Sequence, residues 1–232
     1  INLSLIGTDV HSHLIPGIDD GSNTLEESII LIKQLSDLGY KKIITTPHIM
    51  VDYFKNNADT INSGLATLRN ELSKQNIAIG IEAAAEYMFD DGMIKKFKNK
   101  ELLTFGNNYV LIELSAYNPP ENLIQTFFDL KMEGYTPVLA HPERYLYWHD
   151  NIEFYETLKN HEILFQINIP SLSGYYSPIL KKICEELITR NMVEFAGSDT
   201  HNLEYITMLK KACYSPYLET LINSGKLRNN QL

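Results

Sequence analysis

The chain has 232 residues, of which 44% are hydrophobic and 21% are charged, and its formal net charge is −9. This composition is typical of a soluble globular domain, so we expect residues 1–232 to form a single domain. The acidic balance argues against a nucleic-acid partner, because phosphate backbones are bound through clustered Lys and Arg. No apolar run is long enough to span a membrane, no secretory leader is recognisable, and two cysteines suit a reducing compartment. We therefore expect a cytoplasmic protein.

Apolar runs and helix signals alternate along the chain. Most of the apolar runs are rich in Val, Ile and Leu with little polar alternation, which is typical of strands buried on both faces. Thr24 and Glu27 form a capping box that opens an amphipathic helix, and Gly39 ends it. In chain order we predict a strand near 5–10, a helix over 24–39, a strand near 42–46, a helix over 60–74, strands near 77–83 and 109–114, a helix from after Pro120 to Gly134, strands near 136–140 and 163–168, a helix from Pro178 to about Arg190, and a strand near 193–197.

This alternation predicts parallel βαβ units. A doubly wound open sheet would also satisfy it, but the edge strands of an open sheet lie far apart. Polar residues follow six of the predicted strands, and closure of the sheet brings the carboxyl ends of such strands to one mouth. We therefore expect an α/β protein with a seven-stranded parallel barrel.

The polar residues at the strand ends are of the kinds that bind metal ions. His11 and His13 lie two residues apart at the end of a strand, so both side chains point the same way and can hold one ion. A lone histidine or carboxylate at such a position is more often structural, but six such positions in one chain favour a metal site. The candidate ligands are His11, His13, Asp20, His48, Glu86, Glu113, His141, Asp199 and His201.

Five histidines and four carboxylates exceed the ligand set of one zinc-like ion and indicate two or three ions that share bridging carboxylates. Mixed imidazole and carboxylate donors favour Mn, Fe or Zn over Ca or Mg, and they do not choose among the first three. Three divalent ions would bring +6 to four carboxylates and leave about +2, which a phosphate dianion matches. The candidate ligands therefore point to a substrate that carries phosphate.

The motifs that contain these residues resemble those of a known superfamily. They occur in the order His11-Ser-His13, Gly17-Ile-Asp-Asp-Gly21, Thr46-Pro-His48, Ala85-Glu86, Leu111-Ile-Glu113, Ala140-His-Pro-Glu-Arg-Tyr145 and Gly197-Ser-Asp-Thr-His-Asn202. The combination resembles the PHP (polymerase and histidinol phosphatase) superfamily over essentially the whole chain. Within it, the chain is similar to the manganese-dependent tyrosine-protein phosphatases that are encoded with bacterial capsule and exopolysaccharide genes. The resemblance implies a distorted TIM-like (β/α)7 barrel with a trinuclear site, in which manganese is the expected metal.

The resemblance also implies how the ligands are shared among three ions. His11, His13, Glu86 and Asp199 would hold the first ion. Glu86 would bridge to a second ion that is also held by Glu113 and His141, whereas Asp20, His48 and His201 would hold the third.

Arg144 follows His141 by three residues, and its planar guanidinium suits bidentate contact with phosphate. The alternative is a surface arginine paired with Glu143. We expect Arg144 to bind the substrate phosphate and to act in catalysis together with Asp199 and His201. Capsule-type phosphatases often carry a second arginine shortly after the Asp-x-His motif, but residues 202–206 contain none.

The expected reaction is hydrolysis of phosphotyrosine in a kinase that regulates capsule or exopolysaccharide synthesis. A metal-activated hydroxide would attack phosphorus, while Arg144 and the remaining ions neutralise the non-bridging oxygens. A phenolate with a pKa of about 10 leaves more readily than an alkoxide. The aromatic residues that could sandwich the substrate ring, or could simply pack in the core, are Tyr53, Phe54, Tyr145, Tyr147 and Trp148.

Other functions stay open. A small-molecule phosphatase, such as a histidinol-phosphate hydrolase, would use the same metals on an alkyl phosphate. A nuclease-like module and a non-catalytic metal-binding protein are the further alternatives, and an oligomer is compatible with the sequence. Cys184 and Arg190 match the Cys-x5-Arg spacing of cysteine-dependent phosphatases, but the segment lacks glycine and is predicted to be helical. Asn168 ends the remaining predicted strand and could line the pocket, but we favour the interpretation of a turn residue. We expect His149 and His161 to be exposed.

Overall fold

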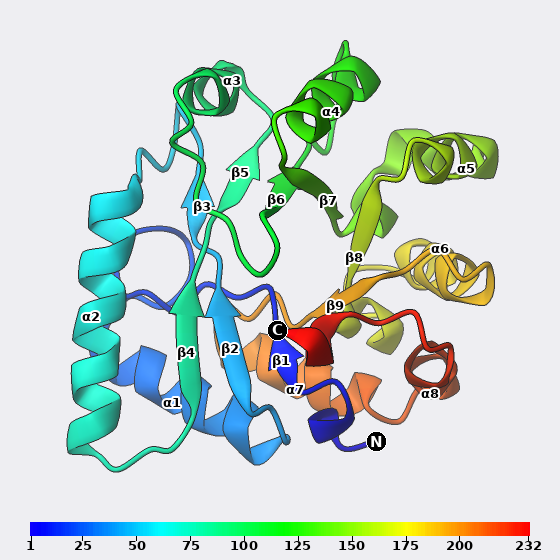
Figure 1. Ribbon diagram of the computed structural model, residues 1–232. Helices are drawn as coiled ribbons and strands as arrows, with labels where there is room; N and C mark the ends of the chain where they lie inside the picture. Colours follow the sequence, from blue (N-terminus) through cyan, green and yellow to red (C-terminus); the bar gives the residue numbers. More distant parts are fainter.

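The computed structural model describes all of residues 1–232 and shows an α/β protein with a curled parallel sheet. All seven pairs of neighbouring strands are parallel. One sheet has the order β1 (Thr8–Asp9), β2 (Lys42–Thr45), β4 (Gly80–Ala83), and the other has the order β3 (His48–Ile49), β5 (Glu86–Met88), β6 (Tyr109–Glu113), β7 (Thr136–Ala140), β8 (Leu164–Asn168), β9 (Phe195–Gly197). Helices surround the outer side of the curled sheet (Figure 1).

Two chain segments run from the first sheet into the second. The run predicted at 42–46 continues beyond a break at Thr46-Pro47 as β3, and the run predicted at 77–83 continues beyond Ala84-Ala85 as β5. Proline has no N–H to donate to a sheet, which accounts for the first break. Because β2 pairs with β4 and β3 pairs with β5, both segments bend together from one sheet to the next.

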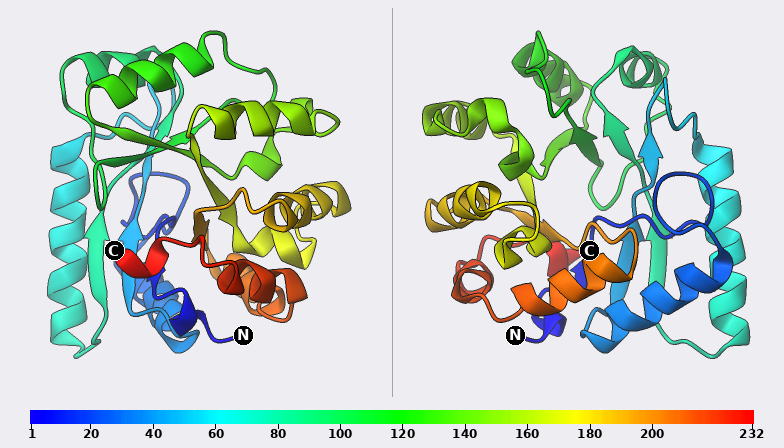
Figure 2. Two further views of the ribbon diagram at one scale, coloured as in Figure 1. Left: turned by 45° about the vertical axis from the view of Figure 1, so that its right-hand side comes forward. Right: turned by 180° about the vertical axis from the view of Figure 1, so that it is seen from behind.

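The first and last strands also approach each other. Ser12 and Thr200 form an isolated parallel bridge. The Asp199 N–H donates to the His11 carbonyl at 2.7 Å, and the His13 N–H donates to the Thr200 carbonyl at 2.9 Å. Both views in Figure 2 show the dark blue start of the chain beside its red C-terminal end. The segment after β1 therefore lies directly against the segment after β9.

The helices are α1 (Leu25–Asp37), α2 (Ala58–Lys74), α3 (Asp91–Lys98), α4 (Leu123–Met132), α5 (Ile152–Asn160), α6 (Pro178–Thr189), α7 (Leu203–Ala212) and α8 (Pro216–Asn223). The helices predicted from capping and periodicity correspond to α1, α2, α4 and α6. The Thr24 side chain accepts from the Glu27 N–H, as the capping box predicts. The predicted strand at 5–10 is mostly wrong: Leu3–Leu5 is a turn of 3-10 helix, and only Thr8–Asp9 pairs as β1.

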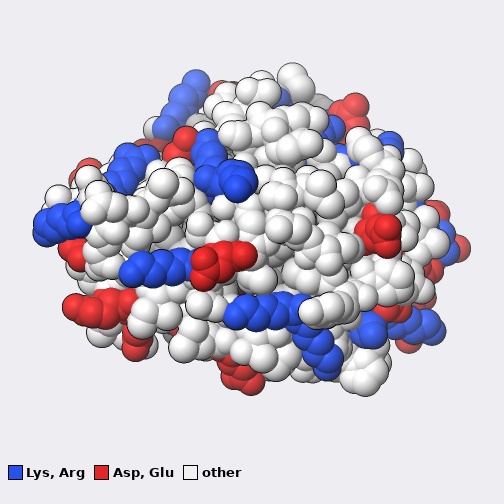
Figure 3. Space-filling view, turned by 90° about the horizontal axis from the view of Figure 1, so that it is seen from below, with Lys and Arg blue, Asp and Glu red and all other residues white.

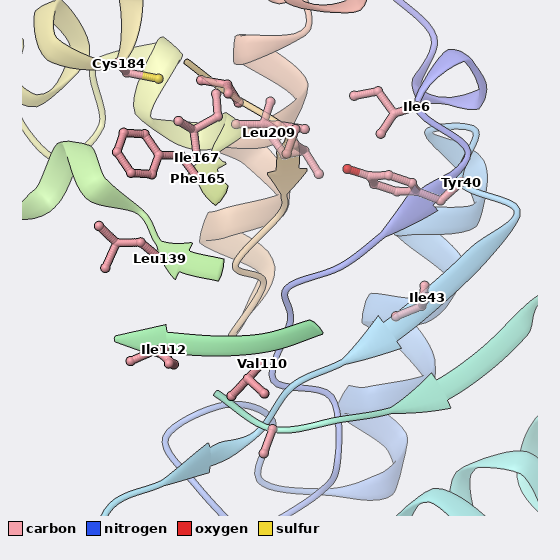
Figure 4. Packing of buried hydrophobic residues seen from close by; sticks show 14 of the residues in the cluster. Ile6, Tyr40, Ile43, Val110, Ile112, Leu139, Phe165, Ile167, Cys184 and Leu209 are labelled. Carbon is pink, nitrogen blue, oxygen red and sulfur yellow. The ribbon is translucent and has the colours of Figure 1, made fainter. Parts of the chain in front are cut away.

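One cluster of 48 buried hydrophobic residues fills the space between the sheet and the helices. Figure 4 shows part of it, with Ile43, Val110, Ile112, Leu139 and Phe165 pointing from their strands into the packing. No helix has the length and apolarity that a membrane crossing requires. On the face seen in Figure 3, the acidic and basic side chains lie among one another, so no large patch of one sign forms there.

Candidate metal centre

The nine candidate ligands converge at the carboxyl ends of the strands. His48 and Glu86 lie just beyond the carboxyl ends of β2 and β4, at the first residues of β3 and β5. Glu113 ends β6, and His141 directly follows β7. The remaining ligands lie in the loops after β1 and β9. The shortest contacts join Glu86 Oε1 to His141 Nε2 at 2.9 Å, and Glu86 Oε2 to both His11 Nε2 and His48 Nδ1 at 3.1 Å. The parallel sheet thus gathers ligands from five strands around Glu86.

Three groups of these side chains are close enough to share an ion. Within each group the donor atoms lie within 4.8 Å of one another; the groups are His13, Asp20, His48 and His201; His11, His13 and Glu86; and His48, Glu86 and Glu113. Asp199 belongs beside the second group, because its Oδ1 lies 3.3 Å from His11 Nε2 and 3.5 Å from His13 Nε2. Glu86 and two histidines occur in more than one group, which is the arrangement of a cluster with bridging ligands.

Hydrogen bonds fix three of the histidine rings. His11 Nδ1 is 2.7 Å from Gln166 Oε1, His13 Nδ1 is 2.8 Å from Asp19 Oδ2, and His201 Nδ1 is 2.8 Å from the Asp199 carbonyl oxygen. Each acceptor holds the proton on Nδ1 and leaves the Nε2 lone pair facing the cluster. Support of this kind orients imidazole ligands in metalloproteins and raises their basicity.

The backbone around the ligands has a shape that is costly for ordinary residues. His141 and Asp199 have φ values of +31° and +50°, in the left-handed region that non-glycine residues rarely adopt. Two glycines permit close approaches: a Cβ on Gly21 would lie 2.2 Å from the His13 carbonyl oxygen, and one on Gly197 would lie 2.5 Å from the His11 Cβ. Strained backbone of this kind is concentrated at functional sites.

The charges in the cluster are not balanced by the protein alone. Burial and the adjacent Glu86 carboxylate raise the pKa of Glu113 well above its ordinary value. Burial acts in the same direction on Glu86, but His11 and His48 outweigh it and hold the pKa of Glu86 well below its ordinary value. Two neighbouring carboxylates therefore compete for the same positive charge, which a bound cation would supply.

Buried atoms without a partner test whether these residues fit metal ions. The seven unpartnered buried side-chain atoms of the protein include four from the cluster, namely His48 Nδ1, Glu86 Oε2, Glu113 Oε2 and His141 Nδ1. Buried polar atoms almost always make a hydrogen bond in folded proteins, so four atoms without one in a single cluster need an explanation. The imidazole and carboxylate donors fit divalent transition ions, and at least the two carboxylate oxygens would gain a partner from them.

The cluster faces a cavity of about 620 Å³. Arg144, Asp199 and His201 line it together with the other cluster residues that reach it. A second part of the lining is apolar or aromatic, with Met50, Tyr53, Phe54, Met88, Phe89, Leu114, Ala116 and Tyr117. The Phe54 ring stacks on the His48 ring, with centroids 5.5 Å apart and planes 10° apart. A substrate with a phosphate at one end and a flat apolar group at the other would match the charged and the apolar parts of this lining.

Comparison with known proteins identifies the family. The family described as capsular polysaccharide synthesis, CpsB/CapC, matches residues 7–219. The chain belongs to this family. The tyrosine-protein phosphatase CpsB of Streptococcus agalactiae serotype III is 30% identical over 97% of this chain and 93% of its own. The tyrosine-protein phosphatase YwqE of Bacillus subtilis is 29% identical over 84% of this chain and 78% of its own.

A solved structure supports the same assignment to the CpsB/CapC family. It comes from work on YwqE from Bacillus subtilis and CpsB from Streptococcus pneumoniae, described as metal-dependent tyrosine phosphatases. Its TM-score is 0.85 at 28% sequence identity, and the match covers 92% of this chain and 87% of that one. The curled parallel sheet with outer helices is therefore the fold of this family.

Several residues of this CpsB/CapC chain support the cluster although the sequence analysis did not predict that they orient its ligands. Asp19, next to the predicted ligand Asp20, is the residue that holds His13. Gln166 holds His11, and Asn168 Nδ2 donates to Asp199 Oδ2 at 2.6 Å. The interpretation of Asn168 as a turn residue is therefore wrong. A signal was present, because two polar residues at i and i+2 in the otherwise apolar β8 must point to the same face.

Arg144 does not pair with Glu143, so that alternative is wrong. Glu143 is fully buried and accepts from the Asn168 N–H and the Ser171 hydroxyl. Arg144 instead lies at the cavity, with Nη1 3.4 Å from Asp199 Oδ2. His161 is exposed as predicted, whereas His149 is partly buried against the Glu143 carbonyl.

The aromatic residues divide into two sets. Tyr145 and Trp148 are buried, and the Tyr145 hydroxyl donates to the Ala140 carbonyl, so these two belong to the core. Tyr147 is partly buried, and its hydroxyl donates to the Ser115 carbonyl. Tyr53 and Phe54 line the cavity. Only this second pair is placed to meet a substrate.

The Cys-x5-Arg spacing is a coincidence. Cys184 lies within α6, is fully buried, and packs in the hydrophobic cluster (Figure 4). Burial raises the pKa of its thiol well above the ordinary value, the opposite of what a nucleophilic cysteine needs. Arg190 binds Glu156 and Glu186 at the surface.

Proposed function

We propose that the protein is a metal-dependent tyrosine-protein phosphatase that acts in capsular polysaccharide synthesis. The observation that carries the proposal is the cluster of five histidines and four carboxylates that opens, beside Arg144, into a cavity with an aromatic wall. Membership of the CpsB/CapC family and the tyrosine phosphatase activity named for its relatives support the substrate class. The physiological substrate we propose is a phosphotyrosine-bearing kinase of the capsule system.

We propose two or three divalent ions, with manganese as the metal. His11, His13, Glu86 and Asp199 would hold one ion, Glu86, Glu113 and His141 the second, and Asp20, His48 and His201 the third. When bound, such ions supply an acidified water as nucleophile and positive charge for the phosphoryl oxygens. The unpartnered carboxylate oxygens of Glu86 and Glu113 support this ligand set.

The protein side chains have separate tasks in the hydrolysis. Arg144 donates N–H groups to the non-bridging oxygens of the phosphoryl group and neutralises charge that develops on them. Asp199 and His201 hold their places at the floor of the cavity through Asn168 and the Asp199 carbonyl. The leaving phenolate has a pKa of about 10 and needs little help from a general acid. Phe54, whose ring stacks on His48, packs against the ring of the substrate.

The cavity favours an aryl phosphate over histidinol phosphate. An alkyl phosphate with an amine would need a free carboxylate near the mouth. Asp90 lies there, but its two oxygens accept from the Met93 and Val51 N–H groups at 2.8 and 2.9 Å, so they are engaged. Asp52 also lines the cavity and makes no hydrogen bond or ion pair, so the preference for an aryl phosphate rests on the aromatic lining and on the activity named for the relatives.

We further propose that residues 1–232 form one domain with the distorted seven-stranded barrel of the PHP superfamily. Support comes from the bridge between Ser12 and Thr200, which joins the two ends of the curled sheet. One hydrophobic cluster that draws on residues from Leu3 to Leu221 supports a single domain. The two free buried cysteines, Cys184 and Cys213, support a cytoplasmic location.

The proposed function is tested by three substrates assayed side by side with manganese. A phosphotyrosine peptide should be hydrolysed with a kcat/KM at least tenfold above that for histidinol phosphate, and a single-stranded oligonucleotide should not be cleaved. Chelation should abolish the activity and manganese should restore it, with two or three ions per chain by elemental analysis. Histidinol phosphate as the best substrate, or full activity after chelation, would refute the proposal.

A further inference from the structure

The two oxygens of Asp199 face different groups. Oδ1 faces the cluster, 3.3 Å from His11 Nε2. Oδ2 faces away from it and meets three side-chain donors: Asn168 Nδ2 at 2.6 Å, the Tyr176 hydroxyl at 3.3 Å and Arg144 Nη1 at 3.4 Å. Arg144 and Tyr176 thus share one carboxylate oxygen, and that oxygen belongs to a candidate ligand.

Tyr176 also contacts Arg144 through its ring. The guanidinium carbon of Arg144 lies 5.1 Å from the centroid of the Tyr176 ring, within the range of a cation–π interaction. The Arg144 side chain is 35% exposed at the cavity edge, where a long flexible side chain has many rotamers in water. Contact with Asp199 along one edge and with Tyr176 on one face leaves few of them.

Two neighbouring tyrosine rings pack against the Tyr176 ring. Tyr176 lies between the 3-10 turn Ile169–Ser173 and α6, and Gly174, with φ of +79°, turns the chain toward it. Its ring lies 5.0 Å from the Tyr175 ring and 6.4 Å from the Tyr205 ring on α7. A tyrosine packed in this way can act as a fixed support for a mobile arginine.

We propose that Tyr176 is a positioning residue for Arg144. The Tyr176 ring packs against the guanidinium, and the Tyr176 hydroxyl contacts the same Asp199 oxygen as Arg144 does. These contacts hold Arg144 at the cavity before the substrate binds. The inference rests on the proposed function, in which Arg144 binds the phosphoryl group. Preorganisation of a donor of this kind saves the ordering of a flexible side chain at the moment of binding.

The test is a double-mutant cycle with Arg144. Tyr176→Leu removes the ring and the hydroxyl, and it should lower kcat/KM on a phosphotyrosine peptide by about threefold to thirtyfold, the range of cation–π contacts. Tyr176→Phe keeps the ring and should stay within about threefold of wild type. In an Arg144→Ala background, Tyr176→Leu should have no further effect. Tyr214→Leu, at an exposed tyrosine that does not line the cavity, is the control and should behave as wild type.

Binding of inorganic phosphate to the manganese-loaded variants separates this inference from the proposed function. Phosphate affinity should fall in Tyr176→Leu only where Arg144 is present, with metal content unchanged. The positioning role would be overturned if Tyr176→Leu lowered phosphate affinity equally in the wild-type and Arg144→Ala proteins. It would also be overturned if Tyr176→Leu lowered phosphate affinity in neither protein. Failure of the proposed function would appear differently, as a wild-type protein that binds phosphate but does not hydrolyse the peptide.

Discussion

Arg144 is the only lysine or arginine among the residues that line the cavity. It is therefore the one side chain lining the cavity that stays positively charged at every working pH, beside the four carboxylates of the cluster. Tyr205 lies in the stretch 202–206, which contains no arginine, and it lines the same cavity. A phenol hydroxyl can donate a hydrogen bond to phosphate but brings no charge. Recognition of phosphate by protein charge consequently depends on one side chain.

For this reason Arg144→Ala should lower kcat/KM on a phosphotyrosine peptide toward the upper part of the range of about 10²–10³, which is typical for loss of one preorganised donor. Metal content should not change, because guanidinium is not a ligand. Arg144→Lys is the control: it keeps the charge but loses the planar fork, so it should recover only part of the activity. A kcat/KM for Arg144→Ala within about threefold of wild type would mean that the metals alone bind phosphate.

At the scale of the elements, the loops after the strands supply much of the chemistry and the helices supply packing. Two candidate ligands have left-handed backbone: His141, directly after β7, and Asp199, two residues after the end of β9. Helix α6 contributes no residue to the cavity, and its Cys184 faces the core. Changes on the inner face of α6 should therefore alter stability and leave catalysis intact.

Cys184→Ala tests this separation. Removal of a buried sulfur should cost about 1 kcal/mol, a common value for a core substitution, and lower Tm by about 2–4 °C in a chain of this length. The kcat/KM should stay within about threefold of wild type. The measurement pairs a melting curve with an assay on the phosphotyrosine peptide. A loss of several hundredfold in turnover with an unchanged melting curve would contradict it and restore the cysteine mechanism.

At the scale of the whole molecule, the cluster links stability to pH and to metals. Burial alone would lower the pKa of His11, but Glu86 and Asp199 outweigh it and raise the pKa to about 9. In the unfolded chain the value is 6.5. A raised histidine pKa stabilises the folded state fully below pH 6.5, and this contribution is lost as the pH rises from 6.5 to about 9.

The metal-free protein should therefore lose more than about 1 kcal/mol of unfolding free energy between pH 6.5 and 9, since each pKa unit corresponds to about 1.4 kcal/mol. The manganese-loaded protein should not, because ions bind deprotonated histidines and hold the folded state more tightly as the pH rises. Urea titrations with and without chelator give the measurement, and His11→Gln, which cannot titrate, should flatten the metal-free profile. A chelated wild-type protein that is as stable at pH 9 as at pH 6.5 would contradict the linkage.

Much of the fold and of the candidate centre was predictable because the signals are local. Each strand is an apolar run, and the candidate ligands lie at or near the ends of such runs, as Glu113 does at the end of β6. Parallel strands then bring their carboxyl ends together whatever the details of packing. The short strands β3 and β5 escaped prediction because His48 and Glu86 interrupt the apolar pattern where each strand begins.

The sequence by itself determined which histidines and carboxylates are candidate ligands, since their residue types and positions relative to the strands are properties of short segments. Only the tertiary structure decided which residues orient them. Gln166 meets His11 across 155 positions of the chain, and Asn168 and Tyr176 meet Asp199 across 31 and 23. Such contacts depend on how the strands curl and how the loops pack, and no spacing in the sequence records them. The different roles of Asp19 and Asp20 also depend on the tertiary structure. In one turn, the Asp19 side chain contacts His13, whereas the Asp20 side chain lies near His48 and His201.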